Sequence, residues 1–121
     1  MAVVLIIDDS PTELHLFQSM LEKAGFDTLV ADSGEEGLKA ARTSRPDCIL
    51  MDVVMPGMNG FQATRQLTKD PITASIPVII ITTKDQETDK IWGMRQGAVE
   101  YLVKPIAPKE LVAMINRVMA A

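Results

Sequence analysis

The stretch VVLIIDDSPTE, residues 3–13, contains the pattern on which the fold of this chain depends. Five apolar residues are followed by two aspartates and then by Ser10 and a proline, which are typical of the first turn of a helix. Ser10 can cap that helix, and Glu13, three residues later, can complete a capping box. The sequence therefore predicts a buried strand over 3–7 that leads through an acidic loop into a helix over 11–24.

The same alternation of a short apolar run and a longer amphipathic segment continues to the end of the chain. Strands are predicted at 3–7, 27–31, 47–51, 77–81 and 99–103, and helices at 11–24, 33–44, 61–69, 85–96 and 108–120. Strands that are apolar along their whole length are typical of a sheet covered on both faces. Short connections between strands and helices favour parallel strands with right-handed crossovers. The predicted fold class is α/β, a three-layer α/β/α domain with a five-stranded parallel sheet.

Polar side chains follow four of the predicted strands at the points where these strands end. Asp8 and Asp9 follow the first strand, Asp52 the third, Thr82 the fourth and Lys104 the fifth. In a parallel sheet all of these ends lie at one edge, where ligands bind near the topological switch point. We therefore expect three carboxylates, a hydroxyl and an ammonium to meet there, although they are far apart in the sequence.

Such a cluster has a chemical consequence. Close carboxylates repel one another, so they need a cation or a proton to coexist. A hard divalent metal with oxygen ligands, Mg²⁺, meets that need. One carboxylate could then attack a phosphoryl group and form an aspartyl phosphate, while the lysine and the threonine contact the phosphoryl oxygens.

Composition limits the alternatives. The chain has 121 residues, which fits one domain over 1–121 with no separate output domain, and 47% of them are hydrophobic. A net charge of -4 argues against binding to nucleic acid or to anionic membranes, and the first apolar run is too short for membrane insertion. Cys48 is the single cysteine; it excludes an intrachain disulfide and fits a cytoplasmic location. Its apolar neighbours predict a buried thiol.

Asp8-Asp9, Asp52 with the following VVMPGMNG, Thr82 and Lys104-Pro105 together resemble the CheY-like response-regulator receiver family over nearly the whole chain. The resemblance implies a flavodoxin-like strand order 2-1-3-4-5. It implies that Asp52 accepts a phosphoryl group from a phosphohistidine on a CheA-like histidine kinase or phosphotransfer domain. Thr82 and Lys104 would assist that transfer, and the Lys104-Pro105 bond would be cis.

The resemblance also implies a metal site and a switch. Asp9, Asp52 and the backbone carbonyl of Val54 would bind Mg²⁺ directly, and Asp8 would bind it through water. Thr82 would be the switch hydroxyl and Tyr101 the switch aromatic, although Tyr101 could also be an ordinary half-buried strand tyrosine. A downstream protein would then recognise the face formed by the fourth helix, the fifth strand and the fifth helix.

A closer resemblance lies in GFQATRQL, residues 60–67, and TTKDQETD, residues 82–89, which are similar to the PilH-type regulators of type IV pilus twitching motility. It implies a regulator in a chemotaxis-like phosphorelay. The same residues would also serve a phosphate sink for a shared kinase. An aspartate-nucleophile phosphatase usually has a second acidic residue two positions after the nucleophile, where this chain has Val54, so we expect no enzyme acting on external substrates. Trp92 is either an exposed interface anchor or packed against a neighbouring helix.

Overall fold

The computed structural model describes residues 2–120, so that Met1 and Ala121, the ends of the predicted domain, lie outside the described part. Strands and helices alternate along these residues, with bounds within two residues of those predicted. The elements are β1 (Val3–Ile7), α1 (Pro11–Lys23), β2 (Asp27–Ala31), α2 (Gly34–Ser44), β3 (Cys48–Met51), α3 (Gly60–Lys69), β4 (Val78–Thr82), α4 (Glu87–Arg95), β5 (Glu100–Val103) and α5 (Pro108–Ala120).

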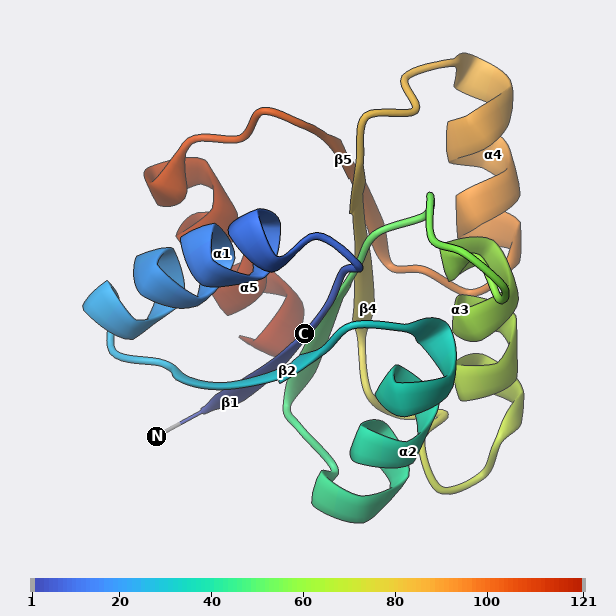
Figure 1. The fold of residues 1–121 in the computed structure, drawn as a ribbon, viewed down its shortest axis with the longest axis horizontal. Helices are drawn as coiled ribbons and strands as arrows, with labels where there is room; N and C mark the ends of the chain where they lie inside the picture. The colour runs from blue at the N-terminus through green and yellow to red at the C-terminus, as the bar shows by residue number, and fades with distance from the viewer. Residues whose placement is uncertain (1, 121) are drawn as a thin grey trace.

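The strands form one parallel sheet in the order β2-β1-β3-β4-β5, which confirms the predicted fold class and strand order. Helices α1 and α5 cover one face of the sheet, and α2, α3 and α4 cover the other (Figure 1). The partly exposed strand β2 lies at an edge of the sheet. Among the helices of residues 2–120, none has both the length and the apolar character that crossing a membrane requires.

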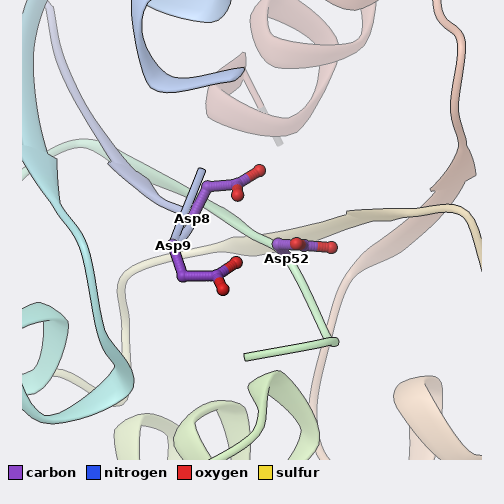
Figure 2. A group of neighbouring side chains, drawn as sticks. All are labelled: Asp8, Asp9 and Asp52. Atoms are coloured by element: carbon purple, nitrogen blue, oxygen red, sulfur yellow. The ribbon is translucent and has the colours of Figure 1, made fainter. Parts of the chain in front are cut away.

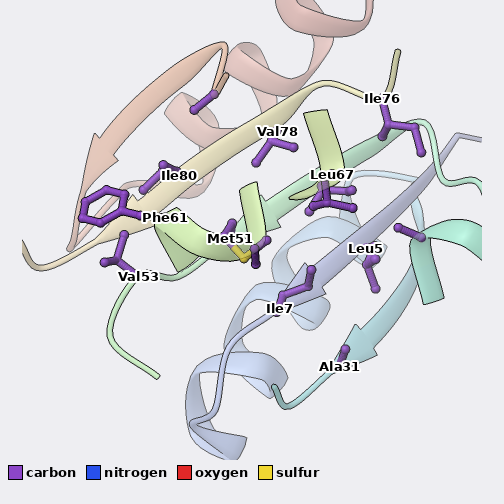
Figure 3. Close-up of a cluster of buried hydrophobic side chains, with 14 of the residues drawn as sticks. Leu5, Ile7, Ala31, Met51, Val53, Phe61, Leu67, Ile76, Val78 and Ile80 are labelled. Atoms are coloured by element: carbon purple, nitrogen blue, oxygen red, sulfur yellow. The ribbon is translucent and has the colours of Figure 1, made fainter. Parts of the chain in front are cut away.

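Two hydrophobic cores explain why the strands are apolar without interruption. Successive side chains of a strand point to opposite faces of the sheet. Leu5 and Ile7 therefore join the core beneath α2, α3 and α4, part of which is drawn in Figure 3. Val4 and Ile6 join the core beneath α1 and α5. Burial on both faces favours an apolar residue at every position, and this rigid sheet holds the loops that follow its strands.

The predicted capping box at the start of α1 is wrong in one of its two halves. The Ser10 hydroxyl accepts a hydrogen bond from the backbone N–H of Glu13 at 3.3 Å, as expected of a cap. The N–H of Ser10, however, donates to Asp8 Oδ1 at 2.9 Å, so it is not free to bind the Glu13 side chain. The carboxylate of Glu13 lies instead against Lys104, 2.9 Å from its Nζ.

Cys48 is buried in β3, as predicted. Burial, as the main cause, raises the pKa of its thiol to about 12. Because the thiolate is the reactive form, we expect no labelling by iodoacetamide at pH 8 in the folded protein and complete labelling in guanidinium chloride. Intact mass spectrometry measures both; labelling of the folded protein at the denatured rate would contradict the buried position.

Candidate functional site

The backbone of the sheet brings the predicted site residues to one edge. Ile7 pairs with Met51 in the parallel register of β1 and β3. The N–H of Asp52 donates to the carbonyl of Ile7 at 2.9 Å, so the residues that follow both strands start from neighbouring positions. On the other side of the sheet centre, the N–H of Lys104 donates to the carbonyl of Thr82 at 2.8 Å.

Three aspartates form an acidic cluster at this edge. Asp8, Asp9 and Asp52 each contribute a carboxylate oxygen, and these oxygens all lie within 4.8 Å of one another. Figure 2 shows the three side chains directed into the same region. Asp8 is buried and Asp9 is exposed, so the cluster has a protein side and a solvent side. Such an all-oxygen donor set fits a hard divalent cation, which can retain waters on the open side.

Lys104 supplies the positive charge beside this cluster. Its Nζ lies 3.0 Å from Asp8 Oδ2, 2.9 Å from Glu13 Oε1 and 3.9 Å from Asp52 Oδ1. Burial by itself lowers the pKa of Lys104, but the hydrogen bonds to Glu13 and Asp8 and the charges of Asp52 and Asp8 together more than reverse this, so the pKa lies above its ordinary value. Lys104 is therefore a fully charged ammonium. The Lys104-Pro105 peptide bond is cis, as the resemblance implies.

Asp52 has an environment that disfavours its charged form. Burial raises the pKa of its carboxyl most strongly, and the neighbouring Asp8 raises it further. Lys104, the backbone N–H of Val53 and the hydroxyl of Thr82 oppose this shift, but the pKa remains above its ordinary value of 3.8. A cation in the acidic cluster would therefore favour the carboxylate that a nucleophile needs.

The two predicted switch residues are both buried and both contact the backbone of Lys84. The hydroxyl of Thr82 accepts a hydrogen bond from the N–H of Lys84 at 3.4 Å. The hydroxyl of Tyr101 donates to the carbonyl of Lys84 at 2.8 Å. Tyr101 is 7% exposed and belongs to the core beneath α4, so it is not the half-buried strand tyrosine considered above. Burial, with Asp89 and Asp85, raises its pKa to about 12.

Two further residues shape the site, and neither was assigned to it from the sequence. Glu13 contacts Lys104 across 91 positions of sequence, which a local pattern cannot reveal. Gly60, the first residue of α3, packs against the backbone that carries Asp52, since a Cβ built there would lie 2.0 Å from the Asp52 carbonyl oxygen. The glycine-rich loop before α3 is the signal that could have indicated this close approach. Val54 has an exposed side chain, and a metal-binding role for its carbonyl stays a prediction.

Known proteins are similar to this chain in sequence and in fold. The profile of the response regulator receiver domain family matches residues 4–116. Protein PilH of Pseudomonas aeruginosa is 60% identical over 120 residues, which cover 99% of both chains. The regulatory protein PhoP of Bacillus subtilis is 36% identical over 96% of this chain but only 48% of its own length, so the chain spans about half of that relative.

Solved structures give the same result. The chemotaxis protein CheY4 of Vibrio cholerae superimposes with a TM-score of 0.92, at 34% identity and with 98% of both chains covered. The receiver domain of the sensor histidine kinase PA1611 of Pseudomonas aeruginosa has a TM-score of 0.92 at 26% identity, covers 99% of this chain and 94% of its own, and holds a magnesium ion in its active-site cleft. The matched profile, the relatives and the acidic edge of the sheet agree, and this chain belongs to the response regulator receiver domain family.

Proposed function

We propose that this receiver domain is a phosphorylatable switch in which Asp52 accepts a phosphoryl group from a phosphohistidine. The observation that carries the proposal is the arrangement of charges at the sheet edge. Asp8, Asp9 and Asp52 place oxygens within 4.8 Å of one another, and the Lys104 ammonium lies 3.9 Å from Asp52. A carboxylate beside a metal-binding acidic pair and a cation is the set that phosphoryl transfer to a carboxylate requires.

The proposed step is an in-line displacement at phosphorus. A carboxylate oxygen of Asp52 forms the new P–O bond while the P–N bond to the donor imidazole breaks, and the leaving nitrogen keeps the electron pair. The ammonium of Lys104 and the hydroxyl of Thr82 contact the phosphoryl oxygens. The product is an acyl phosphate on Asp52 and a free histidine on the donor, so atoms and charges balance.

Mg²⁺ is the proposed cofactor, held by Asp9 and Asp52 directly, by Asp8 through water and by the carbonyl of Val54. The donor set on this chain supports it, as does the magnesium ion in the related PA1611 receiver domain. When bound, the metal supplies positive charge that offsets the repulsion between the carboxylates and the incoming phosphoryl oxygens. We propose no activity on external substrates, because the residue two positions after Asp52 is Val54 rather than an acid.

The proposed output is a change of the face formed by α4, β5 and α5, recognised by a downstream protein. Thr82 and Tyr101 both bond to the backbone of Lys84, so a movement of the Thr82 hydroxyl toward a phosphoryl group would reach Tyr101 through a single residue. Phosphorylation would thereby bias two arrangements of this face. Trp92 on α4 is 51% exposed, which favours the interface-anchor alternative over packing against a neighbouring helix.

The proposed pathway is a cytoplasmic phosphorelay that controls type IV pilus twitching motility, with a CheA-like kinase or a phosphotransfer domain as the donor. The 60% identity to PilH over 99% of both chains supports this placement. An active output and a phosphate sink share the same Asp52 chemistry; the exposed Trp92 favours an output that involves protein contact.

Phosphorylation with a small donor tests the proposal. Incubation with acetyl phosphate and MgCl₂ should add one phosphoryl group, measured by intact mass spectrometry, and excess EDTA should prevent the gain. Reduction with borohydride converts an aspartyl phosphate to homoserine and so identifies the acceptor by peptide mapping. Modification at another residue, such as the exposed His15, or no gain of mass, would refute the assignment to Asp52.

A further inference from the structure

Glu13 stands outside the set of residues from which the proposed function was built, yet it makes the shortest ion-pair contact of Lys104. Its Oε1 lies 2.9 Å from Lys104 Nζ, whereas the nearest oxygen of Asp52 lies 3.9 Å away. The Lys104 side chain is only 11% exposed and that of Glu13 29%, so solvent screens this contact less than a surface pair. The ammonium is therefore held mainly by Glu13 and Asp8 rather than by Asp52.

Helix α1 holds the lysine at two points. Lys104 Nζ lies 5.7 Å from the centre of the Phe17 ring, within the range of a cation–π contact. Glu13 and Phe17 are four residues apart on α1 and so share a face of that helix. The first two turns of α1 thus contact the ammonium of Lys104 through the Glu13 carboxylate and the Phe17 ring.

We infer that Glu13 is a positioning residue that restrains Lys104 in the unphosphorylated protein and slows phosphoryl acceptance by Asp52. This inference rests on the proposed function. An ammonium has three N–H donors, and two of them point at Glu13 and Asp8. The third N–H can reach a phosphoryl oxygen on Asp52, but the ammonium then divides its charge between that oxygen and the carboxylates of Glu13 and Asp8.

Charge acts in the same direction as geometry. Three carboxylates, those of Asp8, Glu13 and Asp52, lie within 3.9 Å of the ammonium of Lys104. A phosphodonor and the phosphorylated product both bring further negative charge to this place. The negative charge of Glu13 repels the incoming phosphoryl oxygens. It also offsets the positive charge of Lys104, which would otherwise attract them. Removal of this one charge should therefore accelerate transfer, although it removes an ion pair.

The test compares Glu13→Gln, which keeps the size of the side chain, with Glu110→Gln as the matched control. Glu110 is an exposed acid in the first turn of α5, so its variant has the same change of charge at an equivalent helix position. With acetyl phosphate and MgCl₂, Glu13→Gln should be phosphorylated about fivefold faster than wild type, the scale of one partly exposed ion pair. Beryllofluoride, measured by calorimetry in MgCl₂, should bind tighter by about the same factor, and Glu110→Gln should match wild type.

A double-mutant cycle shows whether the effect passes through Lys104. In a Lys104→Met background, Glu13→Gln should give little acceleration; an equal acceleration in both backgrounds would overturn the restraint on Lys104. A rate equal to or slower than wild type in the single variant would do the same. If Glu13→Gln unfolds at a lower temperature than wild type, Glu13→Ala replaces it. Absence of phosphorylation in wild type itself would instead refute the proposed function.

Discussion

Replacement of Asp52 by asparagine is expected to abolish phosphoryl uptake and, in magnesium-free buffer, to raise the midpoint of thermal unfolding. The first effect follows because an amide cannot form the acyl phosphate. The second follows because burial and the charge of Asp8 raise the pKa of Asp52, which means that the folded state disfavours its ionised form. An asparagine keeps the shape of the side chain and can still accept the hydrogen bond from the N–H of Val53.

The pH dependence gives the sign of the second effect. Because the pKa of Asp52 is higher in the folded protein than the ordinary 3.8, the wild type loses stability as the pH rises above that value, and the loss is complete once the pH exceeds the folded pKa. At pH 7 the wild type carries the whole penalty, and the asparagine variant carries none. Lys104 is not left without a partner, since Asp8 and Glu13 lie within 3.0 Å of it.

Calorimetry or circular dichroism in EDTA measures this difference. We expect Asp52→Asn to unfold about 3 to 6 °C above wild type at pH 7, on the scale that about 1 kcal/mol produces in a domain of this size. The advantage should shrink as the pH is lowered toward 4 and when MgCl₂ replaces EDTA. The control is Asp27→Asn, which removes an exposed carboxylate at the first residue of β2, at the end of the parallel strands opposite the acidic cluster. It should leave the midpoint unchanged. A lower midpoint for Asp52→Asn than for wild type would contradict the electrostatic account.

The order of elements and the acidic edge could be predicted from the sequence because both depend on local patterns. Five apolar runs, each followed by a helix, leave a parallel α/β sheet as the arrangement that buries every run. Once the strands are parallel, the residues that follow them share one edge whatever their separation in the chain. Asp8 and Asp52 meet for this reason, 44 positions apart.

The contacts that could not be predicted each depend on a competition between partners. Glu13 fits a capping box, but the N–H that it would accept already donates to Asp8, and a cation lies within its reach. Tyr101 lies on an edge strand, where half exposure is expected. It is buried because α4 packs over it with a glycine, Gly93, at which a Cβ would lie 2.9 Å from the Tyr101 ring. Neither outcome is visible in the residues that flank each position.

Gly60→Ala is expected to cause the largest loss of stability of any single substitution proposed for this chain. A Cβ at Gly60 would lie 2.0 Å from the carbonyl oxygen of Asp52 and 2.8 Å from both its carbonyl carbon and the Cα of Val53. All three atoms belong to the backbone, so no side chain can rotate to make room. The N–H of Gly60 also donates to the carbonyl of Val53 at 2.9 Å, a bond that any shift of α3 would lengthen. We expect a destabilisation of about 3 kcal/mol or more.

Gly37→Ala is the control that distinguishes a clash with backbone atoms from the general effect of replacing a buried helical glycine by alanine. Gly37 lies inside α2, and a Cβ there would lie 2.4 Å from Cδ1 and 2.9 Å from Cγ1 of Ile7, which are side-chain atoms rather than backbone atoms. Alanine also gains about 1 kcal/mol of helix propensity over glycine inside a helix, which offsets part of the cost. Urea unfolding should therefore place Gly37→Ala much closer to wild type than Gly60→Ala. In Gly60→Ala, phosphorylation by acetyl phosphate should also slow, since the backbone that must move carries Asp52. Equal urea midpoints for the two variants would show that the backbone around Asp52 moves as easily as the Ile7 side chain. The close contact of α3 would then not be what holds Asp52 in position.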